Sequence, residues 1–175
     1  MAKVYLIDVT NRDGVQTSRM GLAKLEKTII NMMLNEMGIF QSEMGFPFTR
    51  HEQNYINANL ELAQMKVLSP IRLEGWCRAI TKDVELSFKL CPNIRHLNLS
   101  ISTSTIMLEQ KFMNKFSPKD IIDGMVDAVK LAYSKGAETV AVNAEDASRS
   151  DIKFLAEFGN AEAARGAGRR AEPYP

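Results

Sequence analysis

This chain of 175 residues has few cysteines and histidines and nearly equal numbers of basic and acidic residues, and each feature argues against a class of function or site. Its 22 Lys and Arg face 21 Asp and Glu, so the net charge of +1 gives no electrostatic basis for binding nucleic acid or a membrane surface. Its two cysteines, Cys77 and Cys91, lack a disulfide-framework spacing, and we expect reduced thiols. The only histidines are His51 and His96, and we expect no zinc site.

Long apolar runs and glycine-rich loops are lacking as well. No apolar stretch of membrane-spanning length occurs, and Met1-Ala-Lys3 leads directly into a strand pattern rather than into a signal peptide. These features predict a soluble cytoplasmic protein. Gly14 stands alone after the first strand pattern, so the phosphate loop of a nucleotide-binding Rossmann fold is missing.

Short apolar runs alternate with longer segments of helical periodicity. Ser117, Pro118 and Asp120 form a helix-start pattern, and Gly136 forms a helix stop, which together delimit the clearest helix. The segment 102–117 is expected to be an extended insertion between a strand and a helix. Strands are predicted near 4–9, 39–44, 71–77, 94–101 and 138–143, with helices near 21–37, 51–66, 81–90 and 118–135 and a fifth beginning near 150. Five strand–helix units predict an α/β protein with a parallel sheet.

The strand patterns favour a barrel over an open sheet. In 94–101, Leu97 and Leu99 alternate with His96, Asn98 and Ser100, whereas central strands of an open doubly wound sheet are apolar on both faces. Polar residues also end each strand, as catalytic residues do in (β/α)8 TIM barrels, although strand ends that meet solvent would look similar. Such a barrel takes about 250 residues. The chain is therefore predicted to be an incomplete barrel of about five β/α units.

The composition changes abruptly near residue 158. Residues 1–158 are predicted to form the amino-terminal part of the barrel, and the segment 159–175 contains no large aliphatic residue. We expect this segment to be a disordered or aberrant tail. A truncated product, a split subunit and a partial sequence all remain open.

The segment Asp8–Gln16 is the strongest candidate for a site. It places Asp8, Arg12, Asp13, Gly14 and Gln16 at the carboxyl end of the first predicted strand. Carboxylates suit a divalent metal, arginine suits developing negative charge, and glycine permits a tight turn. A charged loop without function is the alternative.

Five segments in order resemble the pyruvate-carboxyltransferase-like (DRE-TIM) family. They lie at successive predicted strand ends: Asp8-Val-Thr-Asn-Arg12-Asp13-Gly14-Val-Gln16, Glu43-Met-Gly45-Phe-Pro47, Trp76-Cys-Arg78-Ala, His96-Leu-Asn-Leu-Ser100-Ile-Ser102-Thr-Ser104 and Glu145-Asp146-Ala-Ser148-Arg149. The third segment resembles nitrogenase-associated homocitrate synthases. The chain departs from the family pattern at Val9, Asn11 and Val15.

The resemblance implies a condensation of acetyl-CoA with a 2-oxo acid, with a divalent metal, Mg²⁺ or Mn²⁺, as Lewis acid. It implies that Asp13 is a metal ligand. It also assigns catalytic roles to Arg12, Glu43 and Glu145, and substrate binding to Gln16, Arg78, His96 and Ser100.

Arg78 and the motif Glu145–Arg149 favour 2-oxoglutarate and hence homocitrate synthase. Re-type citrate, 2-isopropylmalate and citramalate synthases remain alternatives, as does a non-catalytic half-barrel subunit. The His-X-His metal motif expected of the family is lacking, so a complementary carboxyl-terminal half-barrel or a homodimer is an expected partner.

Overall fold

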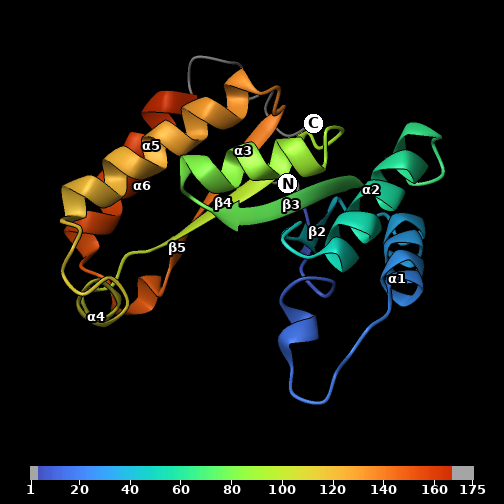
Figure 1. Ribbon diagram of the computed structural model, residues 1–175, viewed down its shortest axis with the longest axis horizontal. Helices are drawn as coiled ribbons and strands as arrows, with labels where there is room; N and C mark the ends of the chain where they lie inside the picture. The colour runs from blue at the N-terminus through green and yellow to red at the C-terminus, as the bar shows by residue number, and fades with distance from the viewer. Residues whose placement is uncertain (1–3, 167–175) are drawn as a thin grey trace. The chain divides into compact units, whose positions relative to one another are not determined.

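The computed structural model describes residues 4–166, in which strands and helices alternate (Figure 1). The strands are β1 (Ile7–Asp8), β2 (Gln41–Gly45), β3 (Arg72–Arg78), β4 (His96–Ser102) and β5 (Thr139–Glu145). The helices are α1 (Lys24–Glu36), α2 (Arg50–Gln64), α3 (Thr81–Leu90), α4 (Thr105–Gln110), α5 (Pro118–Ser134) and α6 (Ile152–Gly166), with short 3₁₀ helices η1 (Gly14–Gln16) and η2 (Ala147–Arg149). Among the described residues, no helix has the length and apolar character needed to span a membrane.

The five strands form one sheet in the order β1-β2-β3-β4-β5. β1 pairs parallel with β2, and β2 pairs parallel with β3. Strand order that follows chain order is the order of a (β/α)8 barrel, because a doubly wound sheet reverses direction at a switch point. The topology thus agrees with the predicted start of a barrel.

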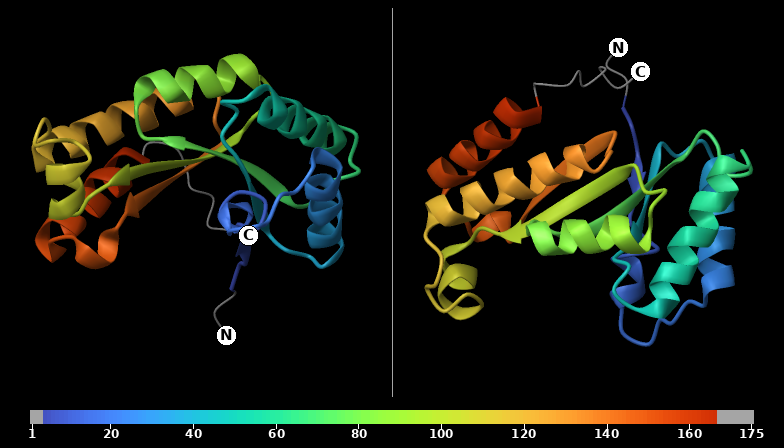
Figure 2. Two further views of the ribbon diagram at one scale, coloured as in Figure 1. Left: turned by 60° about the horizontal axis from the view of Figure 1, so that its bottom comes forward. Right: turned by 45° about the horizontal axis from the view of Figure 1, so that its top comes forward.

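The chain divides into two compact units. The first comprises Met1–Trp76 and Leu86–Leu97, and the second comprises Cys77–Glu85 and Asn98–Pro175. In the first unit, α1 packs against α2, and in the second, α5 packs against α6 (Figures 1 and 2). Each unit has its own fully buried apolar residues: Met44, Ile56, Cys91, Ile94 and Leu97 in the first, and Cys77, Leu99, Met125, Ala128 and Ala132 in the second.

The start of α5 confirms the capping pattern read from the sequence. The Ser117 side chain accepts a hydrogen bond from the backbone N–H of Asp120, and the Asp120 carboxylate accepts one in return from the backbone N–H of Ser117. Pro118 occupies the first turn, where its missing N–H has no intrahelical partner to lose. Gly136 follows the helix with a φ of 102°, a conformation that favours glycine.

Three segments differ from the predictions. β1 spans only two residues instead of 4–9; Val4 and Leu6 precede it and are exposed, because β1 is an edge strand with β2 as its single neighbour. The insertion 102–117 contains α4, which Ser104 caps by accepting from the N–H of Met107. α6 runs past residue 158 to Gly166, and the remainder of the predicted tail, 167–175, lies outside the described residues.

Replacement of two glycines by alanine tests the packing, because one replacement should lower the free energy of unfolding and the other should raise it. A Cβ on Gly75 of β3 would lie 2.3 Å from Cδ1 of Ile94 and 3.3 Å from Cδ2 of Leu97, both fully buried side chains, so Gly75→Ala should destabilise by about 1–3 kcal/mol. A Cβ on Gly124 of α5 meets nothing within 4 Å, so Gly124→Ala should stabilise by about 0.5–1 kcal/mol. Free energies of unfolding from urea titrations measure both, and equal shifts would contradict the packing around Gly75.

Candidate active site

The loop after β1 is a tightly hydrogen-bonded turn. The carboxylate of Asp8 accepts hydrogen bonds from the backbone N–H of Thr10 at 2.9 Å and from its hydroxyl at 3.0 Å. The backbone N–H groups of Arg12, Asp13 and Gly14 all point at the carbonyl oxygen of Val9, at 3.2, 2.8 and 3.1 Å. A short acidic side chain that holds the backbone two residues onward is a common way to fix a turn. The turn presents Arg12 and Asp13 at defined positions.

Arg12 lies between two carboxylates and an aromatic ring, all within the first unit. Its Nη1 is 2.6 Å from Oδ1 of Asp13, and its Nε is 3.8 Å from Oε1 of Glu43. Its guanidinium carbon lies 4.2 Å from the centre of the Trp76 ring. The ring supports one face of the guanidinium while the carboxylates attract its edge. The structure therefore brings together three predicted site residues, Arg12, Asp13 and Glu43.

Glu43 has a second carboxylate beside it. Glu43 on β2 and Glu74 on β3 are paired in the parallel register, and both side chains are buried. Burial, followed by the charge of Glu43, raises the pKa of Glu74 to about 7, against a smaller opposing effect of a hydrogen bond with Gln41. Neighbouring buried carboxylates repel each other when both are ionised, and this repulsion favours a proton on one of them. Sequence analysis did not select Glu74, although it lies on the polar side of a strand that ends in a motif residue, Arg78.

Asp13 is the predicted metal ligand, and its side chain is 57% exposed. Its closest described partner is Arg12, a cation. Within residues 4–166, no group of three or more His, Cys, Asp or Glu side chains is arranged to hold a metal ion. The described residues do not form a metal site by themselves; they offer one carboxylate at this position.

A buried cation lies next to this site. Lys27 on α1 is only 4% exposed; its Nζ lies 2.9 Å from Oε1 of Glu52 on α2 and 5.0 Å from the centre of the Tyr55 ring. The other oxygen of Glu52 would be 2.9 Å from a Cβ on Gly45, at the end of β2. Gly45 has a φ of 135°, so both its backbone and its neighbour require glycine. The Glu43–Gly45 motif thus combines an acid with a glycine that leaves room for Glu52.

Glu145 ends β5 in the second unit, and two donors hold its carboxylate. Lys111 donates from Nζ to Oε2 of Glu145 at 2.7 Å and to Oγ of Ser102 at 2.9 Å, and Ser102 in turn donates to the same Glu145 oxygen. Partial burial raises the pKa of Glu145, but the hydrogen bonds from Lys111 and Ser102 outweigh it and lower the pKa overall. Glu145 is therefore kept ionised. Lys111 lies in the insertion 102–117, and no sequence signal identified it.

The rest of the Glu145–Arg149 motif shapes the loop after β5. Asp146 has a φ of 65°, and its carboxylate accepts from Nε of Arg149 at 2.7 and 3.0 Å. Ser104 also donates to Asp146. These contacts join the loop after β4 to the loop after β5 within the second unit, so Asp146 and Arg149 have a local structural role.

The four predicted substrate-binding residues lie in different settings. Gln16 is exposed in η1, and Ser100 is buried in β4. Arg78 is 61% exposed and forms a two-pronged pair with Asp83 of α3, at 2.6 and 3.0 Å. His96 is the first residue of β4 and so lies at its amino end, whereas a site residue is expected at the carboxyl end. This position gives the substrate-binding prediction for His96 no support.

Comparisons with known proteins identify relatives along almost the whole chain. The profile of the HMGL-like family matches residues 3–170. Citrate (Re)-synthase of Dehalococcoides mccartyi is 62% identical over 169 residues, 97% of this chain and 41% of that protein. 2-Isopropylmalate synthase 2 of Caldanaerobacter subterraneus subsp. tengcongensis is 38% identical over 95% of this chain and 41% of its own length. Homocitrate synthase AksA of Methanocaldococcus jannaschii is 32% identical over 95% of this chain and 39% of its own length. The chain thus spans about two fifths of the length of these relatives.

The buried Glu43–Glu74 pair predicts a particular pH dependence of stability. Because folding raises the pKa of Glu74 from about 4.5 to about 7, the folded state holds a proton that the unfolded state releases, and stability falls as the pH rises between these values. The loss amounts to about 3 kcal/mol at completion. Glu74→Gln should remove this loss, so its stability relative to the original chain should increase from pH 5 to pH 8.

Urea titrations at several pH values measure the effect, with Glu61→Gln on the exposed side of α2 as the matched control. The control should keep the pH dependence of the original chain. The same slope in Glu74→Gln as in the control would contradict a proton held at Glu74.

Proposed function

The chain belongs to the HMGL-like family, and we propose that it forms the amino-terminal part of an acetyl-CoA-dependent citrate synthase of the Re type. The observation that carries this choice is the 62% identity to a protein named Citrate (Re)-synthase, against 32% to a homocitrate synthase. The homocitrate reaction expected from Arg78 and the Glu145–Arg149 motif is not supported by these identities. The pairing of Arg78 with Asp83 also weakens the argument for homocitrate synthesis, because that argument used Arg78 to bind 2-oxoglutarate.

The proposed reaction joins an acetyl group to a 2-oxo acid. Citrate, divided at the carbon–carbon bond that an acetyl group forms, gives acetyl-CoA and oxaloacetate, which is one methylene shorter than 2-oxoglutarate. The methyl carbon of acetyl-CoA loses a proton and attacks the ketone carbon, and the ketone oxygen takes up the electron pair and then a proton. Water then cleaves the thioester and releases CoA as a thiol.

Arg12 is proposed to stabilise the negative charge that develops on the ketone oxygen. Its guanidinium stays charged at any working pH and carries several donors in one plane. Trp76 supports one face of that plane, and Asp13 and Glu43 attract its edge, so the group is held in place before substrate binds. A donor that is fixed in advance avoids reorganisation during the reaction.

Asp13 is proposed to supply one oxygen ligand to Mg²⁺ or Mn²⁺, with the remaining ligands coming from beyond the described residues. When bound, such an ion polarises the ketone of the 2-oxo acid and orients it. Glu43 and Glu145 are proposed to orient substrate. Lys111 and Ser102 support this role for Glu145 because they keep it ionised and fix its position. For Gln16, Ser100 and Arg78 we retain contact with the 2-oxo acid as a proposal.

Two apolar surfaces of the first unit support a partner that supplies the rest of the barrel. Beside the edge strand β1, Val4 is 80% and Leu6 is 61% exposed. On α1 and at its end, large apolar side chains recur at helical spacing and are exposed: Leu25, Ile29, Met33 and Met37. An unpaired parallel edge and an apolar helix stripe are what a further strand and helix of a barrel would cover.

The test is a thiol-release assay on the chain mixed with a separate polypeptide that carries the remaining length of the 62% relative. Acetyl-CoA and Mg²⁺ or Mn²⁺ are supplied with a panel of oxaloacetate, 2-oxoglutarate and other 2-oxo acids. We expect CoA release with oxaloacetate in the mixture and none from the chain alone. Preference for another 2-oxo acid would reject citrate synthesis, and a folded complex without turnover would favour a non-catalytic subunit. Turnover by the chain alone would reject the need for a partner.

The role of Arg12 predicts that Arg12→Ala lowers kcat in that mixture by about 100- to 1000-fold, because a fixed donor to the developing oxyanion is lost. Arg50→Ala removes an exposed arginine from the same unit and should leave kcat unchanged. Circular dichroism verifies that both variants fold. Normal turnover of Arg12→Ala would remove Arg12 from its proposed role.

A further inference from the structure

We propose that Asn31 of α1 is a positioning residue that fixes Arg12 relative to Glu43. Its side-chain oxygen accepts one hydrogen bond from Nδ2 of Asn11 at 2.9 Å and a second from Oγ of Ser42 at 2.7 Å. Asn11 immediately precedes Arg12, and Ser42 immediately precedes Glu43. One oxygen atom thus connects the two segments that carry the guanidinium and the buried carboxylate. The importance of this geometry for catalysis rests on the proposed function, whereas the geometry itself does not.

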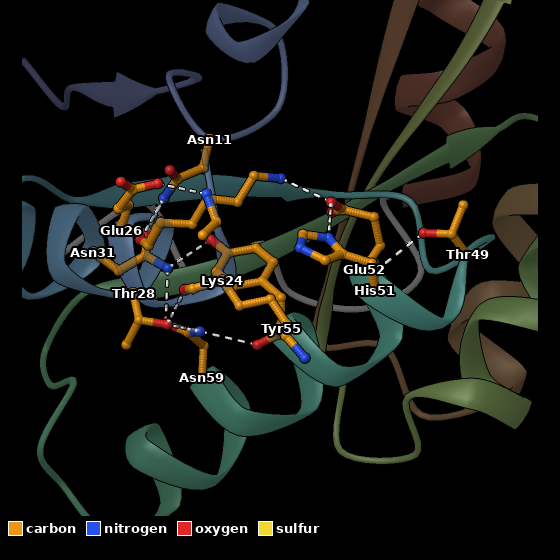
Figure 3. A network of polar contacts seen from close by, with 12 residues as sticks. Asn11, Lys24, Glu26, Thr28, Asn31, Thr49, His51, Glu52, Tyr55 and Asn59 are labelled. Carbon is orange, nitrogen blue, oxygen red and sulfur yellow. Dashed lines mark hydrogen bonds and ion pairs between the residues drawn. The ribbon is translucent and has the colours of Figure 1, made fainter. Parts of the chain in front are cut away.

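The direction of these hydrogen bonds follows from groups that can act in only one way. The backbone carbonyl of Lys27 can only accept, and it receives a hydrogen bond from Nδ2 of Asn11 at 3.0 Å. The amino group of Asn11 therefore faces α1, and its second hydrogen meets the oxygen of Asn31. The opposite side of the Asn31 amide donates to Tyr55 and Asn59, both at 2.9 Å (Figure 3). Each side of the Asn31 amide is thereby assigned.

Burial makes this connection rigid. Asn11, Asn31 and Ser42 are completely buried, so water cannot replace a lost partner. Asn59 further supports Asn31 by donating to Thr28 and to the backbone carbonyl of Tyr55, each at 2.9 Å. Burial raises the pKa of Tyr55, which keeps its hydroxyl neutral. Because Asn11, Asn31, Ser42, Tyr55 and Asn59 are neutral and completely buried, the geometry around Asn31 should not vary with solution conditions near neutral pH.

Asn11 is one of the positions at which the chain departs from the family pattern. An apolar side chain there could fill the space, but it could not fix a direction. Hydrogen bonds are directional, so the pair Asn11–Asn31 specifies the orientation of the turn that presents Arg12. The distance that this orientation should fix is the 3.8 Å between Nε of Arg12 and Oε1 of Glu43.

Trp76 provides a readout of this geometry that needs no activity. It is the only tryptophan in the chain, and the Arg12 guanidinium lies 4.2 Å from its ring centre. The indole N–H therefore gives a single resonance in a ¹H–¹⁵N spectrum, and its position depends on the charge above the ring. Arg12→Ala defines the resonance of a ring without the guanidinium.

The experiment compares Asn31→Ala with Asn59→Ala in the full chain. Both residues are fully buried asparagines of the same network, but Asn59 contacts the nitrogen side of the Asn31 amide and not its oxygen. Asn31→Ala should move the indole resonance toward the Arg12→Ala position. Asn59→Ala should lower the melting temperature and leave the resonance in place. Equal movement in the two variants, or no movement in folded Asn31→Ala, would overturn the proposal.

Two milder variants keep the test decisive if Asn31→Ala does not fold. Asn11→Ala and Ser42→Ala each remove one donor to the Asn31 oxygen, and Asn11→Ala should produce the larger movement because it frees the turn of Arg12 directly. An unmoved resonance in both would reject the proposal.

The activity assay with the remaining barrel then separates this inference from the proposed function. Asn11→Ala should lower kcat by about 10- to 100-fold while KM for acetyl-CoA stays within about twofold, since a small misplacement of a reacting group acts on the chemical step. Movement of the resonance without any turnover in the original mixture would reject the proposed function and keep the positioning role.

Discussion

Strand β2 imposes a constraint on which the first unit depends, because all five of its residues are buried although three of them are polar. Each polar side chain on this strand needs a partner within the protein. Ser42 donates to Asn31, Glu43 faces the guanidinium of Arg12, and Gln41 forms a hydrogen bond with Glu74 of β3. The polar side chains of β2 therefore help to hold the loop after β1, helix α1 and strand β3 in place. The candidate site is formed by the same contacts that make burial of this strand possible.

The carboxylates of the two units differ in how readily they retain a proton. In the first unit, Glu43 and Glu74 lie side by side in a buried setting that favours retention of a proton. In the second unit, Glu145 lies near the surface and receives donors from Lys111 and Ser102, which keep it ionised. The proposed condensation and thioester hydrolysis require both proton uptake and proton release, and each unit offers a carboxylate suited to one of these steps.

The sequence revealed much of the fold because its signals are local. Alternating apolar and polar residues identified the strands, and the Ser117–Asp120 box and Gly136 identified the ends of α5, since each depends on neighbours within a few positions. The motifs also led to Arg12, Asp13 and Glu43, which the structure brings together.

What the sequence did not reveal depends on distant partners. Asn31 acts through residues 20 positions before it and 11 positions after it, and Lys111 acts through Glu145, 34 positions away. The two-residue length of β1 follows from its pairing with β2, more than 30 positions away. The substrate role of His96 stays a prediction: His96 begins β4, and alternation within a strand does not distinguish its amino end from its carboxyl end. The homocitrate prediction relied in part on Arg78, whose guanidinium pairs with Asp83, a contact five residues onward that the motif does not reveal.

The two cysteines lie in different units, and their labelling can report where the structure opens. Cys91 belongs to the first unit and Cys77 to the second, and both are completely buried. Burial raises the pKa of Cys91 to about 11, so its thiol is protonated and unreactive in the closed unit. An alkylating reagent can reach either sulfur only when the surrounding unit opens. The labelling rates of Cys91 and Cys77 therefore report how often the structure opens around each thiol.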